Sequence, residues 1–123
     1  MKRYLTWYVE ATSGDLTSQG PVYCLDDDYD PFTVRAHIKG KPATADEFRY
    51  DIKCDGVSIF TVKPIIAKGV TSEEVTEGFV QGMTLDKYSY VTLDLTDPNG
   101  ATGITITLEL TSVSEDSAAG SDT

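Results

Sequence analysis

One histidine and one run of aspartates are the residues of this chain best suited to chemistry. His37 lies between Arg35 and Lys39 in a stretch that alternates apolar and polar residues. Catalysis by a histidine needs a nucleophile or a substrate proton within reach, and no serine or cysteine motif accompanies this one. We therefore expect His37 to be a surface residue of a strand. The sequence predicts a protein that is not an enzyme, with no catalytic residue and no cofactor.

The densest group of charges is Asp26, Asp27, Asp28 and Asp30. Alternating aspartates in a loop can bind calcium through their carboxylate oxygens. The segment lacks the glycine and the distal glutamate of an EF-hand loop, so no metal site is predicted. The pattern favours an acidic surface loop that contacts a partner, with Asp26 and Asp28 as candidate contact residues. A calcium site on this loop stays open as an alternative.

The two cysteines, Cys24 and Cys54, show neither metal-binding nor redox spacing. Both are expected at inward-facing strand positions, where a free cysteine packs as a small hydrophobic residue. A disulfide between neighbouring strands stays open, although such bonds belong mainly to oxidising compartments. The cysteines therefore indicate packing rather than chemistry.

Charge and length limit the classes of partner. The 123 residues include 20 acidic and 10 basic side chains, for a net charge of −10. Nucleic acid and anionic membranes would repel such a chain, so neither is expected as a partner. No apolar run is long enough to span a bilayer, and Glu10 interrupts the first one. We expect one soluble domain that is made inside a cell.

The segment FRYDIKCDGVSIF, residues 48–60, has the pattern of a β-hairpin. Asp55-Gly56 separates two alternating runs and favours a type I′ turn, because both residues tolerate positive φ. Cys54 should then pair with Val57. Phe60 falls on the opposite face and needs a cover, from a loop or from a second chain. The face expected to enter the core carries Phe48, Tyr50, Ile52, Cys54, Val57 and Ile59.

Alternation predicts further strands with turn signals between them. Residues 72–77 could form one helical turn but are interpreted mainly as loop, followed by a strand near 79–83. Residues 112–123 are small, polar and acidic, and are expected to be a flexible tail outside a domain of residues 1–111. The remaining strands are expected over 3–11, 22–25, 32–39, 65–66, 88–95 and 104–111.

The alternation also assigns faces to these strands. In residues 32–39, Phe32, Val34, Ala36 and Ile38 are expected to point inward. Tyr4, Tyr8, Tyr88 and Tyr90 lie opposite the aliphatic stripes of their strands. Together with Phe60, these rings could stack on sugar or bury against a neighbouring subunit. About eight short strands without helical periodicity predict an all-β fold, an antiparallel β-sandwich or barrel.

Three segments carry a resemblance to a known group of proteins: FRYDIKCDGVSIF (48–60), KYSYVTLDL (87–95) and GITITLEL (103–110). They resemble the F-x-x-D-I-x-x-D/N-G-x-S-I-(F/W) hairpin, the distal L-T-L-D strand and the closing T-(V/I)-x-L-x-L strand of small bacteriophage virion proteins and fibre-tip domains. The resemblance covers most of residues 2–111. It implies a jelly-roll-like β-sandwich, assembled as a trimer on a phage particle, and it brings no catalytic residues.

The domain begins at Met1 without a shaft, which favours a separately made protein. We therefore expect a virion structural protein, made in the host cytoplasm, that decorates or cements the capsid head. Its partners would be further copies of itself and the major capsid protein or another virion protein. Contact would use edge-strand pairing and the residues Tyr4, Tyr8, Phe60 and the 26–30 loop. The alternative is a tail or fibre module that binds a host receptor or glycan through Tyr88 and Tyr90.

Overall fold

The computed structural model of the protein describes residues 2–11, 16–39, 48–67, 69–80, 83–96 and 101–113. This part of the chain is built from antiparallel β-strands. The strands are β1 (Lys2–Ala11), β2 (Leu16–Cys24), β3 (Tyr29–Ile38), β4 (Phe48–Cys54), β5 (Val57–Ser58), β6 (Ile65–Ile66), β7 (Ser72–Val75), β8 (Tyr90–Thr96) and β9 (Thr102–Ser112).

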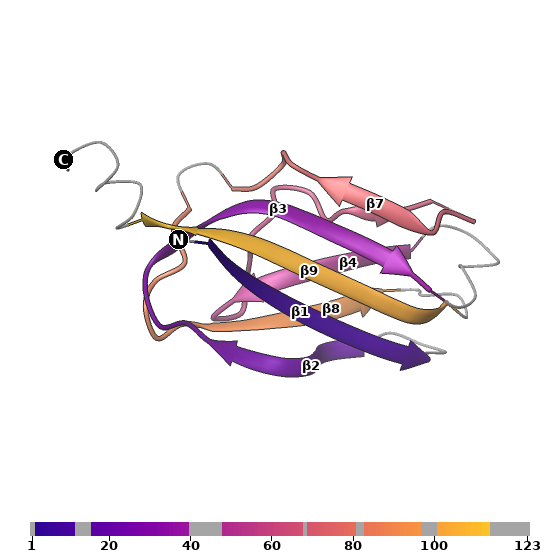
Figure 1. The fold of residues 1–123 in the computed structure, drawn as a ribbon, viewed down its shortest axis with the longest axis horizontal. Coiled ribbons are helices and arrows are strands. Elements are labelled where there is room, and N and C mark those ends of the chain that lie inside the picture. Colours follow the sequence, from indigo (N-terminus) through magenta and orange to yellow (C-terminus); the bar gives the residue numbers. More distant parts are fainter. Residues whose placement is uncertain are drawn as a thin grey trace.

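The strands form two sheets that pack face to face (Figure 1). Sheet A has the order β1-β9-β3-β7, and sheet B has the order β2-β8-β4-β5 with β6 also paired to β4. The pairs are nested along the chain, because β1 pairs with β9, β2 with β8, β3 with β7 and β4 with β5. Nested antiparallel pairs shared between two sheets are the arrangement of a jelly roll. The predicted all-β sandwich is confirmed, and the described part of the chain has nine strands where about eight were expected.

The core lies between the sheets and follows the alternation of the sequence. Each fully buried aliphatic or aromatic side chain stabilises the fold by roughly 1.5–3 kcal/mol. Trp7 is fully buried and meets the ring of Tyr23 edge to face, with ring centroids 5.3 Å apart. The inward residues predicted for β1, β8 and β9 are confirmed wherever side chains are described: Leu5, Trp7, Val9, Val91, Leu93, Leu95, Ile104, Ile106, Leu108 and Leu110.

The hairpin at Asp55-Gly56 is confirmed in turn and register. Asp55 and Gly56 have φ values of 52° and 83°, and Cys54 pairs with Val57. Val57 was expected in the core, but it is exposed on β5, a two-residue strand at the end of sheet B. The other inward residues of this hairpin are buried as predicted: Phe48, Tyr50, Ile52, Cys54 and Ile59.

The predicted orientation of Phe32 is wrong because β3 contains a bulge. Pro31 pairs with Leu110 and Thr33 with Glu109, so Phe32 has no partner on β9. An extra residue in one strand bends it and re-aims the local side chains. Phe32 is consequently 53% exposed, and Thr33, which was expected at the surface, is buried. The inward positions that follow, Val34, Ala36 and Ile38, are as predicted.

The segment between β6 and β8 also differs from expectation. The short extended piece at 65–66 is confirmed as β6. Residues 72–75, interpreted as loop or helical turn, form β7 on the open edge of β3, where Ser72 pairs with His37 and Val75 with Val34. The strand expected near 79–83 is absent from its described residues, and Phe79 makes a single bridge to Phe60. Residues 72–75 thus form a strand because β3 supplies their hydrogen-bond partners, and Phe79 pairs only with Phe60.

The domain boundary was predicted at residue 111. The last strand ends at Ser112, one residue later, and the expected tail lies mostly in residues 114–123, outside the described residues. Within the described ranges there is no helix with the length and apolar character needed to cross a membrane.

Candidate functional site

The candidate contact residues fall into three places in the fold. Tyr4 and Tyr8 lie on β1 and point away from the core, on the outer surface of sheet A. Tyr88, Tyr90 and the 26–30 loop lie together at one end of the sandwich. Phe60 is in the core. The exposed candidates therefore lie on two separate surfaces, the outer side of sheet A and one end of the sandwich, which the sequence could not distinguish. Phe60 lies on neither surface.

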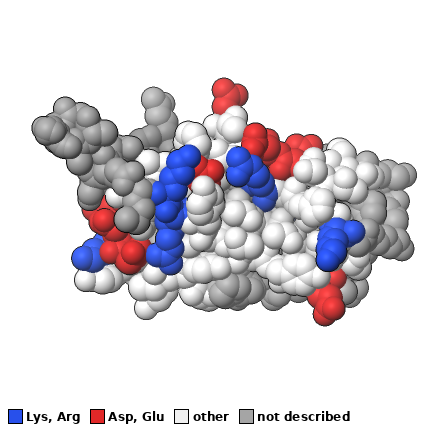
Figure 2. All heavy atoms as spheres, viewed as in Figure 1, with Lys and Arg blue, Asp and Glu red and all other residues white. Residues whose placement is uncertain are grey.

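The outer surface of sheet A, called here the sheet A face, is mostly uncharged (Figure 2). Tyr4, Tyr8 and Phe32 are each about half exposed on it. Between β1 and β3, the outward side chains of β9 include Thr105 and Thr107, which are partly buried. Aromatic residues are enriched in surfaces that contact other proteins. Sequence reasoning missed Phe32, although Pro31 inside a strand is a signal for a bulge.

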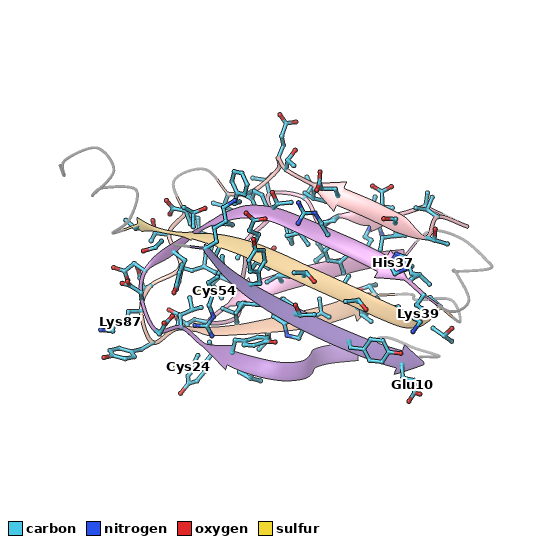
Figure 3. The ribbon with its side chains drawn as sticks, in the orientation of Figure 1. Glu10, Cys24, His37, Lys39, Cys54 and Lys87 are labelled. Atoms are coloured by element: carbon cyan, nitrogen blue, oxygen red, sulfur yellow. The ribbon has the colours of Figure 1, made fainter. Side chains whose placement is uncertain are left out.

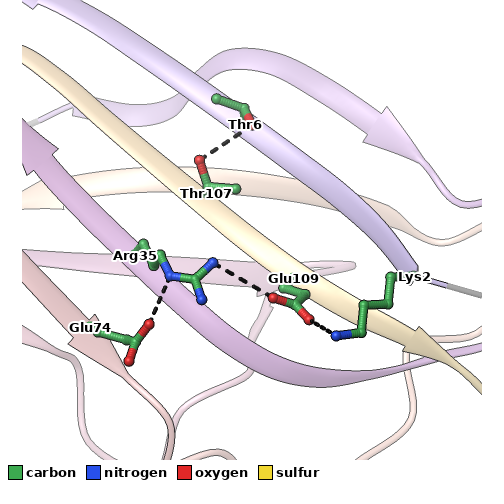
Figure 4. Close-up of polar contacts among 6 residues, drawn as sticks. All are labelled: Lys2, Thr6, Arg35, Glu74, Thr107 and Glu109. Atoms are coloured by element: carbon green, nitrogen blue, oxygen red, sulfur yellow. Dashed lines mark hydrogen bonds and ion pairs between the residues drawn. The ribbon is translucent and has the colours of Figure 1, made fainter.

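Four charged side chains on the sheet A face neutralise one another (Figure 4). Glu109 is only 4% exposed, with Lys2 Nζ 2.9 Å from its Oε2 and Arg35 Nη1 3.7 Å from its Oε1. Arg35 Nε also donates to Glu74 Oε2 at 2.7 Å. The hydrogen bond to Glu109 raises the pKa of Lys2. Two cations thus balance two carboxylates within this cluster, so a partner that buried the cluster would not leave one of these four charges unpaired.

The free edge of β1 is blocked by a side chain from sheet B. The Tyr23 hydroxyl accepts a hydrogen bond from the Thr6 N–H at 3.2 Å and donates one to the Thr6 carbonyl at 2.6 Å. On the other side of β1, the Thr6 and Thr107 hydroxyls lie 3.3 Å apart (Figure 4). Proteins protect exposed strand edges from pairing with other chains in this way. Contact through β1 is therefore expected to use its outer face rather than its edge.

We predict that Tyr23→Phe lowers the free energy of unfolding by about 1–2 kcal/mol, measured by urea denaturation. The ring contact with Trp7 remains, but both hydrogen bonds to Thr6 are lost and its backbone groups are left without these partners. Tyr8→Phe, which removes a hydroxyl from an exposed ring of the same sheet, is the control and should change little. Equal stability of the two variants would show that Tyr23 does not protect the edge.

Phe60 is not a surface residue. It is 5% exposed, stacks on Phe79 with ring centroids 5.4 Å apart and meets Tyr50 edge to face at 6.1 Å. The required cover therefore comes from the 79 segment of the same chain, one of the two covers considered, and not from a second chain. Its expected exposure is therefore wrong, because the ring of Phe79 covers it.

The aspartates of the 26–30 loop hold the fold together. Asp26 Oδ1 accepts from the Tyr29 hydroxyl at 2.7 Å and from Arg3 at 2.8 Å. The hydrogen bond from Tyr29 is the main reason that the pKa of Asp26 is lowered. Asp28 Oδ1 accepts from the backbone N–H of Lys87 at 2.7 Å. These contacts close the chain reversal between β2 and β3.

The same contacts weaken the calcium alternative. The carboxylates accept hydrogen bonds from different donors, and Asp30 Oδ1 accepts from the Thr84 hydroxyl at 3.0 Å. Within the described ranges, no three histidine, cysteine, aspartate or glutamate side chains come together as a potential metal site. The loop is best explained as a structural corner of the sandwich.

The cysteines and the histidine are labelled in Figure 3. Both thiols are free; Cys54 is buried as expected, and burial raises its pKa. Cys24 is exposed, so its predicted inward position is wrong. It lies next to the irregular register of β2, which shifts twice along β8. His37 is exposed on β3, as predicted.

Tyr88 and Tyr90 are exposed as predicted, at the end of the sandwich that also carries the 26–30 loop. The Leu25 N–H donates to the Ser89 carbonyl and the Tyr88 N–H donates to the Leu25 carbonyl, which joins the two segments. Asp55 lies beside them, because its Oδ1 accepts from the Tyr90 N–H at 2.9 Å. We call this region, made of residues 25–30, 55–56 and 86–90, the acidic end.

No protein-family model matches this chain, and no curated protein matches it.

Proposed function

We propose that the protein is a non-enzymatic structural component of a phage particle, a homotrimer that docks on the capsid head through the sheet A face. The virion assignment comes from the resemblance of segments 48–60, 87–95 and 103–110 to phage structural proteins. The choice of surface comes from the structure. His37, the candidate for catalysis, is an exposed residue of β3. The aspartates of the 26–30 loop, the candidates for metal binding, make hydrogen bonds within the fold.

The observation that carries the proposal is the charge balance of the sheet A face. Copies of a chain with net charge −10 repel one another and also repel acidic neighbours. On the sheet A face, Lys2 and Arg35 offset Glu109 and Glu74, so burial there avoids this repulsion. Tyr4, Tyr8 and Phe32 supply apolar area around these pairs. A trimer would engage several sites at once, so weak single contacts would suffice.

Immunogold electron microscopy of purified phage particles tests the virion role. Serum raised against the purified protein should place gold over the head. Gold confined to the tail tip would instead support the receptor-binding alternative, and particles without gold would overturn the virion role. Light scattering tests the trimer, which should weigh about 40 kDa, three times the 13.4 kDa chain.

Docking through the sheet A face predicts the behaviour of a double variant. Tyr4→Asp combined with Tyr8→Asp should abolish co-sedimentation with capsids that lack the protein, because two carboxylates would be buried without partners. Deletion of β1 is a poorer test, since it removes Trp7 from the core. The control is Val62→Asp, on a loop outside this face. Loss of binding in the control alone, with the double variant still bound, would contradict this docking surface.

A further inference from the structure

Tyr88 is held in a backbone conformation that disfavours a large side chain. The Ser89 N–H donates to the Asp86 carbonyl at 3.0 Å, and Tyr88 has a φ of 73°. This is the third position of a type II turn, where glycine is preferred. A non-glycine side chain there is sterically disfavoured. The Lys87 N–H to Asp28 bond at 2.7 Å holds the turn in place, and the ring is 69% exposed.

The ring of Tyr88 already interacts with a positive charge. Lys87 Nζ lies 5.1 Å from its centroid, within the range of a cation–π interaction. This contact shows that a primary ammonium group can approach the face of the ring. Tyr90, two residues further along, presents a second ring that is more than half exposed.

The surroundings of the two rings are strongly acidic. The acidic end carries the carboxylates of Asp26, Asp27, Asp28, Asp30, Asp55 and Asp86. Two cations of the described residues contact this region: the Lys87 ammonium lies over the Tyr88 ring, and Arg3 is already paired with Asp26 at 2.8 Å. Such an excess of negative charge attracts cations and speeds their association.

We propose that Tyr88 and Tyr90, with the surrounding aspartates, form a docking surface for lysine or arginine side chains of a protein partner. The partner's cation would lie over a tyrosine ring as Lys87 does now, and its charge would be complementary to the acidic end. A neutral glycan could stack on the rings and donate hydroxyl hydrogen bonds to the carboxylates, but it would not gain the charge attraction that a cation gains. Binding here does not depend on the virion role, because the sheet A face is a separate surface.

A capped oligo-arginine peptide is a suitable probe, titrated into the full protein by calorimetry at low and at physiological salt. Combining Tyr88→Leu with Tyr90→Leu should weaken binding about 5- to 30-fold, because exposed cation–π contacts contribute roughly 0.5–1 kcal/mol each and two are lost. The matched control combines Tyr4→Leu with Tyr8→Leu. It removes the same number of exposed rings, leaves the charge unchanged and should bind like the parent protein.

Two results would overturn the proposal. Equal affinity in both double variants would mean that the peptide responds to net charge alone. Binding to a glycan array that is lost in the Tyr88 and Tyr90 variant, with no peptide binding, would make the surface a sugar site. Tyr88→Gly serves as the folding check: it relieves the strained turn, so it should be at least as stable as the parent while binding the peptide more weakly.

Discussion

Replacing Phe60 with alanine is expected to lower the free energy of unfolding by about 3–5 kcal/mol. The Phe60 ring is buried, and it stacks on Phe79 and meets Tyr50 edge to face. Alanine would leave a cavity between the loop and sheet B that these two rings can fill only in part. The loss is a large share of the roughly 5–15 kcal/mol that stabilises a typical domain. Urea denaturation measures it directly.

Val62→Ala is the matched control for this prediction. Val62 lies two residues away on the same loop and is 75% exposed, so its truncation should change stability by less than about 0.5 kcal/mol. A Phe60→Ala protein that keeps its stability would mean that the ring is not part of the core. It would then have to be considered again as a contact residue.

Removal of the Ser58 hydroxyl should also be costly, by about 2–3 kcal/mol for Ser58→Ala. The hydroxyl donates to Asp51 Oδ1 at 2.5 Å and accepts from the Phe60 N–H at 3.1 Å. Asp51 is only 2% exposed, faces Asp94 directly across β4 and β8, and its Oδ2 has no hydrogen-bond partner among the described residues. Without Ser58, a buried carboxylate loses its one assigned donor, which costs more than the loss of a neutral hydrogen bond.

A double-mutant cycle with Asp51→Asn isolates this interaction. Asparagine removes the charge that faces Asp94, so the Ser58→Ala change should cost at least about 1 kcal/mol less in the Asp51→Asn background. Ser72→Ala, on the exposed β7 strand, is the control and should cost little in either background. Additive effects of Ser58→Ala and Asp51→Asn would show that the two side chains are not coupled.

Much of the fold could be predicted because the relevant signals are local. A strand places successive side chains on opposite faces, so the inward residues of β1, β8 and β9 follow from alternation alone. The hairpin at Asp55-Gly56 follows from the φ preferences of two adjacent residues. The same alternation correctly predicted that Tyr4, Tyr8, Tyr88 and Tyr90 would be exposed.

The errors occurred where a distant segment changed the local pattern. One extra residue at Phe32 turns that side chain outward, and only the register with β9 reveals it. Phe60 is buried because Phe79 covers it. Residues 72–75 carry no clear strand pattern of their own, but the open edge of β3 provides their hydrogen-bond partners.

The candidate surfaces likewise combine features that the sequence predicts with contacts that only the fold reveals. The sequence supplied the exposed tyrosines and the aspartate run, but it did not indicate that Lys2, Arg35 and Glu74 would gather around Glu109. These four residues come from four different strands of sheet A. Likewise, the strained turn at Tyr88 depends on hydrogen bonds between residues 86–89 and the 25–30 loop.

The sequence by itself determined the all-β class, the inward faces of the long strands, the main hairpin and the acidic character of the protein. Each depends on neighbouring residues or on composition. Tertiary structure alone decided that Phe60 is core, that the aspartates of 26–30 form a corner, and that one face of sheet A is charge-balanced. These outcomes depend on which distant groups meet, and long-range strand pairing sets those contacts.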